Sequence, residues 1–374
     1  MSTVKLSVAV IDPVGAKAGL DEYNLSLLEE LELLGCRVHL FSNFTSTKFQ
    51  ETETKLFEYR EKQNLFSVFS LMQEYKKALR ICRRVNSHYV IFHIFHFNFL
   101  DEWVLQQAHD SGFKIILIIH DVESFVFKTD HSRLQRICRQ YAYKLVVHNE
   151  YTKAELLRCL EAGTRLEVHV IPHGNFSSLA KSKFSKEKAR DQLNWDPDRK
   201  YILFFGMLKP AKGLDVLLQA LPQISQEATL VIAGRLRKHS FEQYNAIIKS
   251  KNIRDRILLN LRHISNEERN LLFSASDVIA LPYKRIYQSG VLLMAMSYGL
   301  PVVASALPAI KEVVRHGENG LLFETENPDD LALQLNRLFN DESLQSRLGE
   351  QARADSAKHH NWKGIAASFY SLFS

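Results

Sequence analysis

The sequence predicts an α/β protein built from two doubly wound, Rossmann-like domains, and three observations lead to this fold class. The chain has 374 residues, which is more than one ordinary hydrophobic core needs. Short apolar runs alternate with segments of helical periodicity, a pattern typical of βαβ units and parallel sheets. The alternation occurs in two series, and a polar, lysine-rich stretch over 177–198 lies between them. We interpret this stretch as the domain connection.

The first series occupies the N-terminal half. Strand-like runs are expected at 5–11, 37–42, 88–94, 114–119 and 144–148. Helical segments are expected at 20–34, 100–109 and 133–143. Gly35 is a plausible residue to end the first of these helices, because glycine readily adopts the left-handed conformation found there.

The second series begins near residue 200. Strand-like runs are expected at 201–205, 229–233, 257–260, 278–281 and 302–304. Helices are expected between them, including 214–220, 267–274 and 291–297. In doubly wound sheets, ligands bind at the C-terminal ends of the strands, so the turns that follow these runs are where chemistry is expected.

Composition and charge narrow the class of protein. The chain is 46% hydrophobic and 24% charged, as in ordinary globular proteins. No apolar run reaches the roughly 20 residues that a membrane-spanning helix needs, and the N-terminus lacks the pattern of a signal peptide. The four cysteines have neither metal-ligand nor redox spacing, so we expect reduced thiols and a cytoplasmic protein.

The net charge of +6 lies wholly in the second half. Residues 1–175 hold 21 basic and 21 acidic residues, whereas residues 176–374 hold 27 and 21. Such an excess suits a domain that binds a diphosphate, but also an anionic membrane, a nucleic acid or a plain solvated surface. Nucleic-acid binding is the weakest of these, since no helix combines basic and aromatic residues in a known reading motif.

One helical segment, 73–84, is strongly basic. Two interpretations stay open. The segment is either a peripheral membrane contact that binds anionic lipid at the inner face of a membrane, or an ordinary surface helix. Its basic residues are Lys76, Lys77, Arg80, Arg83 and Arg84.

Three turns are candidates for ligand binding. Residues 15–19, a glycine-containing turn ending at Gly19, run from a strand into a helix, although a plain turn explains them equally well. Residues 204–213 place Lys209 and Lys212 beside Gly206, where an ammonium could neutralise a diphosphate. Residues 282–290 open the next helix, which Ser289 could cap while leaving its first amides free for phosphate.

Taken together and in order, the motifs resemble the retaining glycosyltransferases of family 4, also called group 1, which adopt the GT-B fold. The resemblance covers nearly the whole chain. It includes His120-Asp121, Val170-Ile171-Pro172-His173-Gly174, Phe205-Gly206, Lys212-Gly213-Leu214, Ala233-Gly234, Ser276-Asp277-Val278, Gly290, the segment 298–304, Glu312-Val313-Val314, the segment 317–322 and Asn361-Trp362.

The resemblance implies domains at 1–175 (acceptor side) and 176–355 (nucleotide-sugar side), and a C-terminal helix over 356–374 that crosses back to the first. It also implies roles for single residues. His120, with Asp121 beside it, would lie near the transferred sugar in the cleft; alternatively His120 is a strand-end histidine that bonds only backbone. Gly19 would close on the diphosphate. The expected donor-binding residues are Gly206, Lys209, Lys212, Gly234, Arg235, His263, Tyr287, Gln288, Ser289, Gly290 and Val291.

Three positions depart from the family pattern. Met207 replaces an arginine, for which Lys209 is a possible substitute, and Ile286 and Met294 replace two glutamates that contact the donor sugar and the ribose. Either a variant Gln-Ser-Gly turn at 288–290 takes over these contacts, or the chain has lost catalysis and serves as a partner subunit of a glycosylation complex. A sugar-nucleotide epimerase would need a cleft cluster beyond His120, Asp121 and Glu123.

We therefore expect a hexosyltransferase that uses a nucleotide-sugar, either a UDP- or a GDP-sugar, and a saccharide or lipid-linked acceptor. No cofactor is expected. A metal is not expected either, because the only Asp-x-Asp, at 196–198, lies in a polar stretch that reads as a turn. The resemblance implies retention of the anomeric configuration and a place in polysaccharide or glycolipid synthesis.

Overall fold

The computed structural model describes residues 6–15, 19–46, 52–58, 65–123, 129–160, 166–181, 184–225, 227–237 and 239–373. Its contacts divide the chain into two compact units. The first holds Met1–Gly174 with Trp362–Ser374, and the second holds Asn175–Asn361. The domain boundaries expected above at 175 and 355 stay predictions.

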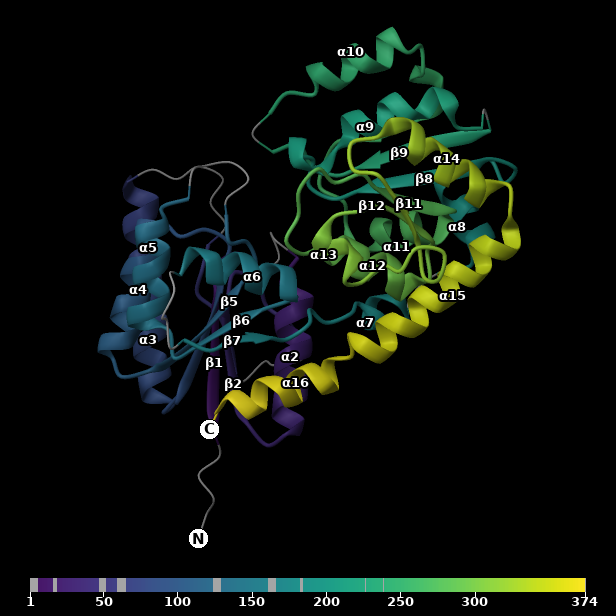
Figure 1. The fold of residues 1–374 in the computed structure, drawn as a ribbon. Coiled ribbons are helices and arrows are strands. Elements are labelled where there is room, and N and C mark those ends of the chain that lie inside the picture. Colours follow the sequence, from purple (N-terminus) through teal and green to yellow (C-terminus); the bar gives the residue numbers. More distant parts are fainter. Residues whose placement is uncertain are drawn as a thin grey trace. The chain divides into compact units, whose positions relative to one another are not determined.

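The first unit is built on a seven-stranded parallel sheet with the order β3-β2-β1-β4-β5-β6-β7 (Figure 1). β1 pairs with β2 on one side and with β4 on the other, in the register Val8↔Val38 and Val8↔Tyr89. The strands are β1 (Ser7–Asp12), β2 (Arg37–Ser42), β3 (Glu53–Lys55), β4 (Tyr89–Ile94), β5 (Lys114–Ile119), β6 (Lys144–Val147) and β7 (Val168–Val170).

Helices cover both faces of this sheet, as β-strands buried on two sides require. α3 and α4 lie on one side, and α2 and α16 on the other (Figure 1). Tyr23 and Leu27 of α2 and Phe369 of α16 are fully buried against Val8 and Val10 of β1. The helices are α2 (Asp21–Leu33), α3 (Leu65–Arg84), α4 (Phe99–Asp110), α5 (His131–Arg136), the π-helix η1 (Ile137–Tyr141), α6 (Glu150–Cys159), α16 (Trp362–Tyr370) and η5 (Ser371–Phe373).

The second unit repeats the plan with six parallel strands in the order β10-β9-β8-β11-β12-β13. The strands are β8 (Lys200–Phe205), β9 (Ala228–Ala233), β10 (Ile257–Asn260), β11 (Val278–Leu281), β12 (Val302–Ser305) and β13 (Leu321–Phe323). The helices are α7 (Ser177–Ala180), α8 (Lys186–Leu193), η2 (Pro210–Lys212), α9 (Leu214–Ala220), η3 (Leu221–Gln223), α10 (Glu242–Ser250), η4 (Arg254–Arg256), α11 (Asn266–Ala275), α12 (Gly290–Tyr298), α13 (Pro308–Lys311), α14 (Pro328–Phe339) and α15 (Glu342–His359).

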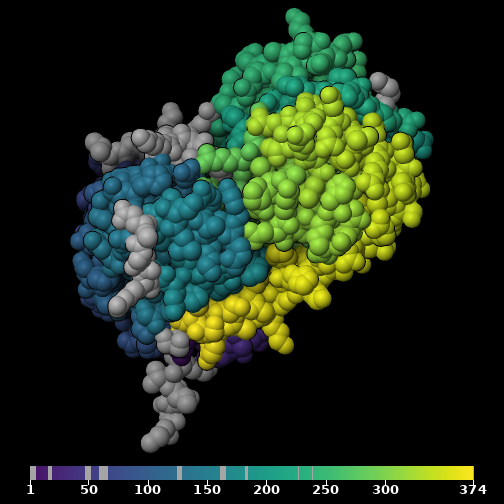
Figure 2. Space-filling model, viewed as in Figure 1, coloured from purple at the N-terminus to yellow at the C-terminus, as the bar shows by residue number. Residues whose placement is uncertain are grey.

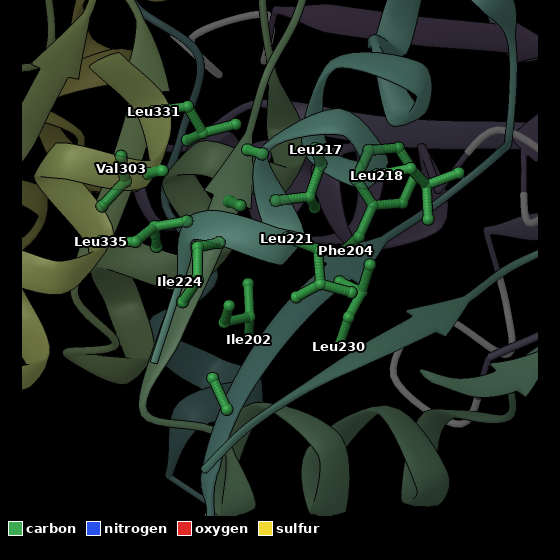
Figure 3. Close-up of a cluster of buried hydrophobic side chains, with 14 of the residues drawn as sticks. Ile202, Phe204, Leu217, Leu218, Leu221, Ile224, Leu230, Val303, Leu331 and Leu335 are labelled. Atoms are coloured by element: carbon green, nitrogen blue, oxygen red, sulfur yellow. The ribbon is translucent and has the colours of Figure 1, made fainter. Parts of the chain in front are cut away.

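Successive side chains of β8 point into two different cores. Ile202 and Phe204 join the core under α9 and α14, whereas Tyr201 and Leu203 join the core under α11 and α12. This alternation follows from the two-residue period of a strand and explains why β8 is apolar from Tyr201 to Phe205. Figure 3 shows the first core, formed by residues that include Ile202, Phe204, Leu217, Leu218, Leu221, Ile224, Leu230, Val303, Leu331 and Leu335.

The interpretation of 177–198 as a domain connection is wrong. The stretch forms α7 and α8, which belong to the second unit. Arg190 of α8 is buried, and its Nη2 donates to Oδ2 of Asp277 at 2.7 Å, while Lys186 Nζ lies 2.7 Å from Oδ1. The same Oδ2 accepts the backbone N–H of Tyr201 at 2.6 Å. This ion-pair cluster anchors the polar stretch to the sheet. The composition of the stretch did not indicate that it packs in this way.

The predicted fold class is confirmed, since both units are doubly wound parallel sheets. α15 lies on the surface of the second unit (Figure 2). It approaches the end of α12 closely, because a Cβ on Gly349 would lie 2.3 Å from the carbonyl oxygen of Gly299. No helix within the described part of the chain is both long and apolar enough to cross a membrane.

Candidate functional site

In each unit the strand order reverses beside the first strand, at β1/β4 and at β8/β11. Loops that leave neighbouring strands in opposite directions open a crevice at such a point, where ligands of doubly wound proteins bind. In the second unit these loops are 206–213, after β8, and 282–290, after β11. Both were predicted to bind the donor.

The loops of the second unit touch through their backbones, and only glycine permits this. Between the two loops, a Cβ on Gly213 (φ +69°) would lie 1.7 Å from the carbonyl oxygen of Pro282. The loop after β9 is equally close, because a Cβ on Gly234 (φ +147°) would lie 1.9 Å from the carbonyl oxygen of Gly206. The contact also includes a hydrogen bond from Lys284 N to Ala211 O at 2.9 Å. The loops therefore form one surface at the carboxyl edge of the sheet.

Lys212 stands on this surface with its charge unneutralised. Its Nζ lies 3.8 Å from the ring centroid of Tyr283, and none of the described carboxylates lies within ion-pair distance of it. The neighbouring Lys284 differs, because its Nζ pairs with Asp215 at 2.6 Å and Glu326 at 3.5 Å. A cation held on an aromatic face but left without a counter-ion is suited to receive an anionic ligand.

The N-terminus of α12 adjoins this lysine. Tyr283 Oη lies 3.2 Å from Oγ of Ser289, which in turn accepts the N–H of Leu292 at 3.2 Å, so Ser289 is the predicted cap. The first amides of a helix have no partner within it and attract anions. Lys212 and this helix end are thus linked through one tyrosine.

Other predicted donor-binding residues lie next to the Ser289 cap. Gly290 faces Phe176, and a Cβ on Gly206 would lie 3.4 Å from Val291 Cγ2. Tyr287 is buried. The side-chain amide nitrogen of Gln288 is buried without a hydrogen-bond partner among the described residues, and such an orphan donor suits a ligand oxygen.

The remaining predicted donor residues lie further out. Arg235 is exposed, and its carbonyl accepts the N–H of Leu208 at 2.9 Å. His263 is exposed in the loop after β10. Lys209 precedes η2 and is partly exposed. Their nucleotide-binding roles stay predictions.

The departures from the family pattern have a structural counterpart. Met294 is 8% exposed and belongs to the apolar core under α12, and the partly buried Ile286 packs against this core. Both side chains therefore contribute packing. At the third departure, Nη1 of Arg237 lies 3.6 Å from the Met207 sulfur and brings a guanidinium to that loop. Sequence reasoning missed Arg237 because it follows a different strand, β9.

In the first unit, His120 is largely buried at the end of β5 and bonds more than backbone. The backbone N–H of His120 donates to the backbone oxygen of Ile94 at 2.9 Å, and the imidazole ring stacks on Phe95 with centroids 4.4 Å apart. Its Nε2 lies 2.8 Å from Nδ1 of His93. Asp121 follows and is partly exposed. The alternative of a histidine that bonds only backbone is wrong.

A hydrogen-bonded chain continues from His120 into the unit. Nε2 of His93 lies 2.8 Å from Oδ1 of Asn24, and Nδ2 of Asn24 lies 2.7 Å from Oδ2 of Asp12. The other oxygen of Asp12 accepts the N–H groups of Val14 and Gly15, both at 2.9 Å. Asp12 thereby also holds the start of the glycine turn. Of that turn, Gly19 has φ +72° and open space around it, and residues 16–18 lie outside the described residues.

Four imidazoles surround Tyr23. Its ring centroid lies 4.9 Å from that of His173, 5.1 Å from that of His93, 5.7 Å from that of His148 and 6.3 Å from that of His120. Burial, with a smaller effect of the His148 charge, lowers the pKa of His93 to about 3 and that of His120 well below its ordinary value. These rings are therefore neutral at pH 7. Within the described ranges, no three His, Cys, Asp or Glu side chains are placed to hold a metal ion.

Comparisons with known proteins agree with this arrangement. Residues 185–355 match the family described as "Glycosyl transferases group 1". The chain is 32% identical over 215 residues to the D-inositol 3-phosphate glycosyltransferase of Xylanimonas cellulosilytica, an alignment that covers 55% of this chain and 51% of the relative. This chain thus matches only about half the length of the first curated relatives.

Solved structures of the same fold include sucrose-phosphate synthase from Thermosynechococcus elongatus (TM-score 0.81, 22% identity, 99% of this chain and 98% of the other). A second is Anabaena HepE in complex with UDP-glucose (TM-score 0.77, 18% identity, 98% of each chain). At these identities the likeness establishes the fold.

The chain shares the GT-B fold with these solved structures. The match to the group 1 glycosyltransferases covers residues 185–355, which make up most of the second unit.

Proposed function

We propose that this chain transfers a hexose-type sugar from a UDP- or GDP-sugar to a saccharide or lipid-linked acceptor, with retention and without a metal ion. The observation that carries the proposal is Lys212, a cation without a described counter-ion that rests on Tyr283 beside the capped N-terminus of α12. The UDP-glucose complex of HepE supports the choice of donor class.

Breaking the bond between the anomeric carbon and the donor phosphate leaves negative charge on the departing diphosphate. Lys212 and the free amides at Gly290 and Val291 would stabilise that charge, and they are already in place before the reaction. A fixed ammonium and a helix N-terminus can serve where other enzymes use a divalent cation. The metal-independent mechanism stays a proposal.

The test is a thermal-shift screen with UDP-, GDP- and ADP-sugars, followed by hydrolysis of the best binder with and without EDTA. The proposal expects stabilisation by one donor class and slow release of free sugar that EDTA leaves unchanged. Donor binding without release of sugar, even with candidate acceptors, would favour the alternative of a catalytically impaired partner subunit. The apolar packing of Ile286 and Met294 supports that alternative. No shift with any donor would refute nucleotide-sugar binding.

We also propose that α3 touches anionic lipid. Its five basic residues are all exposed, and so are Phe66 (88%) and Phe69 (62%) near its start. Cationic side chains attract anionic headgroups, and exposed aromatic rings can enter the interface. This would place a lipid-linked acceptor within reach of a peripheral protein.

A further inference from the structure

The direction of the hydrogen bonds between Asp12 and His120 follows from the first member of the chain. Burial raises the pKa of Asp12, whereas its hydrogen bonds act in the opposite direction. Oδ1 accepts two backbone N–H groups at 2.9 Å and Oδ2 faces Nδ2 of Asn24, so every hydrogen-bond partner of this side chain is a donor, an arrangement that suits the carboxylate form. An ionised carboxylate can only accept hydrogen bonds. Asn24, at 2.7 Å, must therefore turn its NH₂ group to Asp12 and its carbonyl oxygen to His93.

That orientation determines the proton of each imidazole. Nε2 of His93 faces the carbonyl oxygen of Asn24 at 2.8 Å, so it carries the proton and donates. A neutral imidazole has one N–H and one bare nitrogen, which leaves Nδ1 of His93 as the acceptor. It lies 2.8 Å from Nε2 of His120, and this nitrogen must then donate.

We propose that Asp12, acting through Asn24 and His93, holds His120 in the Nε2–H tautomer, so that the bare Nδ1 of His120 is a fixed hydrogen-bond acceptor for a ligand hydroxyl. Nδ1 of His120 has no partner among the described residues, and the ring is held by stacking on Phe95. Asn24 and His93 are positioning residues. The inference rests on the proposed function only for the hydroxyl, which would belong to a sugar substrate.

The same carboxylate also arranges the glycine turn. Oδ1 of Asp12 holds Val14 and Gly15, while Oδ2 directs the chain to His120. One buried charge thus organises the two predicted site elements of the first unit, which are more than 100 residues apart in sequence.

The test is Asp12→Asn, because this isosteric change is predicted to reverse the chain. The oxygen of the new amide would keep accepting Val14 and Gly15, so its NH₂ must point to Asn24. Asn24 must then flip and donate to His93 Nε2, His93 must donate from Nδ1, and His120 must carry its proton on Nδ1. The hydrogen bonds that join residue 12, Asn24, His93 and His120 survive with opposite direction, while those from Val14 and Gly15 are unchanged.

Two-dimensional ¹H–¹⁵N spectra of protein labelled with ¹⁵N-histidine read the tautomer without any substrate, with the His120 signal identified by its loss in His120→Gln. We expect Nε2–H in the wild type and a complete exchange to Nδ1–H in Asp12→Asn. Asp21→Asn, which removes a nearby charge outside the chain, should leave the tautomer unchanged. Wild-type His120 protonated on Nδ1 would overturn the proposal even if Asp12→Asn failed to fold, and so would an unchanged tautomer in a folded variant.

The proposed function and the tautomer of His120 are tested by separate measurements. If no donor is hydrolysed but His120 shows the expected tautomers, the positioning chain stands and the proposed reaction fails. If a donor is hydrolysed while the tautomer does not respond to Asp12, the reaction stands and the positioning role fails.

Discussion

The buried, neutral histidines of the first unit should make the protein sensitive to mild acid. His93 has its pKa lowered from about 6.5 to about 3 by burial, so it takes up a proton readily only after unfolding. Below pH 6.5 the unfolded chain takes up a proton on His93 that the folded protein does not. The contribution of His93 to the free energy of unfolding is therefore fully present above pH 6.5 and is lost as the pH falls from 6.5 towards 3. The loss is about 1.4 kcal/mol per pH unit.

Between pH 7 and pH 5, His93 alone should therefore lower the free energy of unfolding by about 2 kcal/mol. Replacing it with Gln removes the titrating group, so the variant should lose about 2 kcal/mol less than the wild type over this range. Urea unfolding followed by tryptophan fluorescence at pH 7, 6 and 5 measures the difference. His131→Gln, at an exposed position on α5, should keep the wild-type dependence. Equal pH dependence in wild type and His93→Gln would refute the reasoning.

Three further outcomes follow from the second unit and from α3. Gly213→Ala should destabilise by about 2–5 kcal/mol, since its Cβ would meet Pro282 O at 1.7 Å, whereas Gly317→Ala, at a similar φ of +80° in open space, should cost only about 1–2 kcal/mol in thermal unfolding. Equal costs would contradict the loop contact. Arg237→Gln should weaken nucleotide binding up to about fivefold by calorimetry, as an exposed charge does, and unchanged affinity would exclude it from the site. Lys76→Glu with Lys77→Glu should abolish sedimentation with phosphatidylglycerol vesicles, and Lys249→Glu with Lys251→Glu on and beside α10 should not; equal behaviour would refute the lipid surface.

Sequence reasoning identified the strands that are buried on both faces. β1, β5, β8 and β9 each contain a run of at least four apolar residues, because the central positions of a parallel strand covered by helices are buried on both faces. Strands of three residues, such as β3 and β13, are too short to show a period and were not predicted.

The polar contacts were beyond the reach of sequence. Lys212 and Ser289 were singled out for their positions in turns, but their link through Tyr283 depends on the folding of two loops about 70 residues apart. The partners of His120 are likewise distant in sequence, and nothing in the local pattern connects Asn24 with His93. Periodicity reports burial, whereas these pairings are set by the order of strands in the sheet.

The most direct test of the central claim is the affinity of a nucleoside diphosphate for the Lys212 site. Calorimetric titration of UDP, or of the diphosphate chosen by the donor screen, would compare wild type, Lys212→Gln and Lys284→Gln. A lost charged contact of about 1.5–3 kcal/mol predicts at least a tenfold weaker affinity for Lys212→Gln. Lys284→Gln, which removes a lysine already paired with Asp215, should stay within about twofold of wild type. Unchanged affinity in Lys212→Gln, or an equal loss in both variants, would contradict the account.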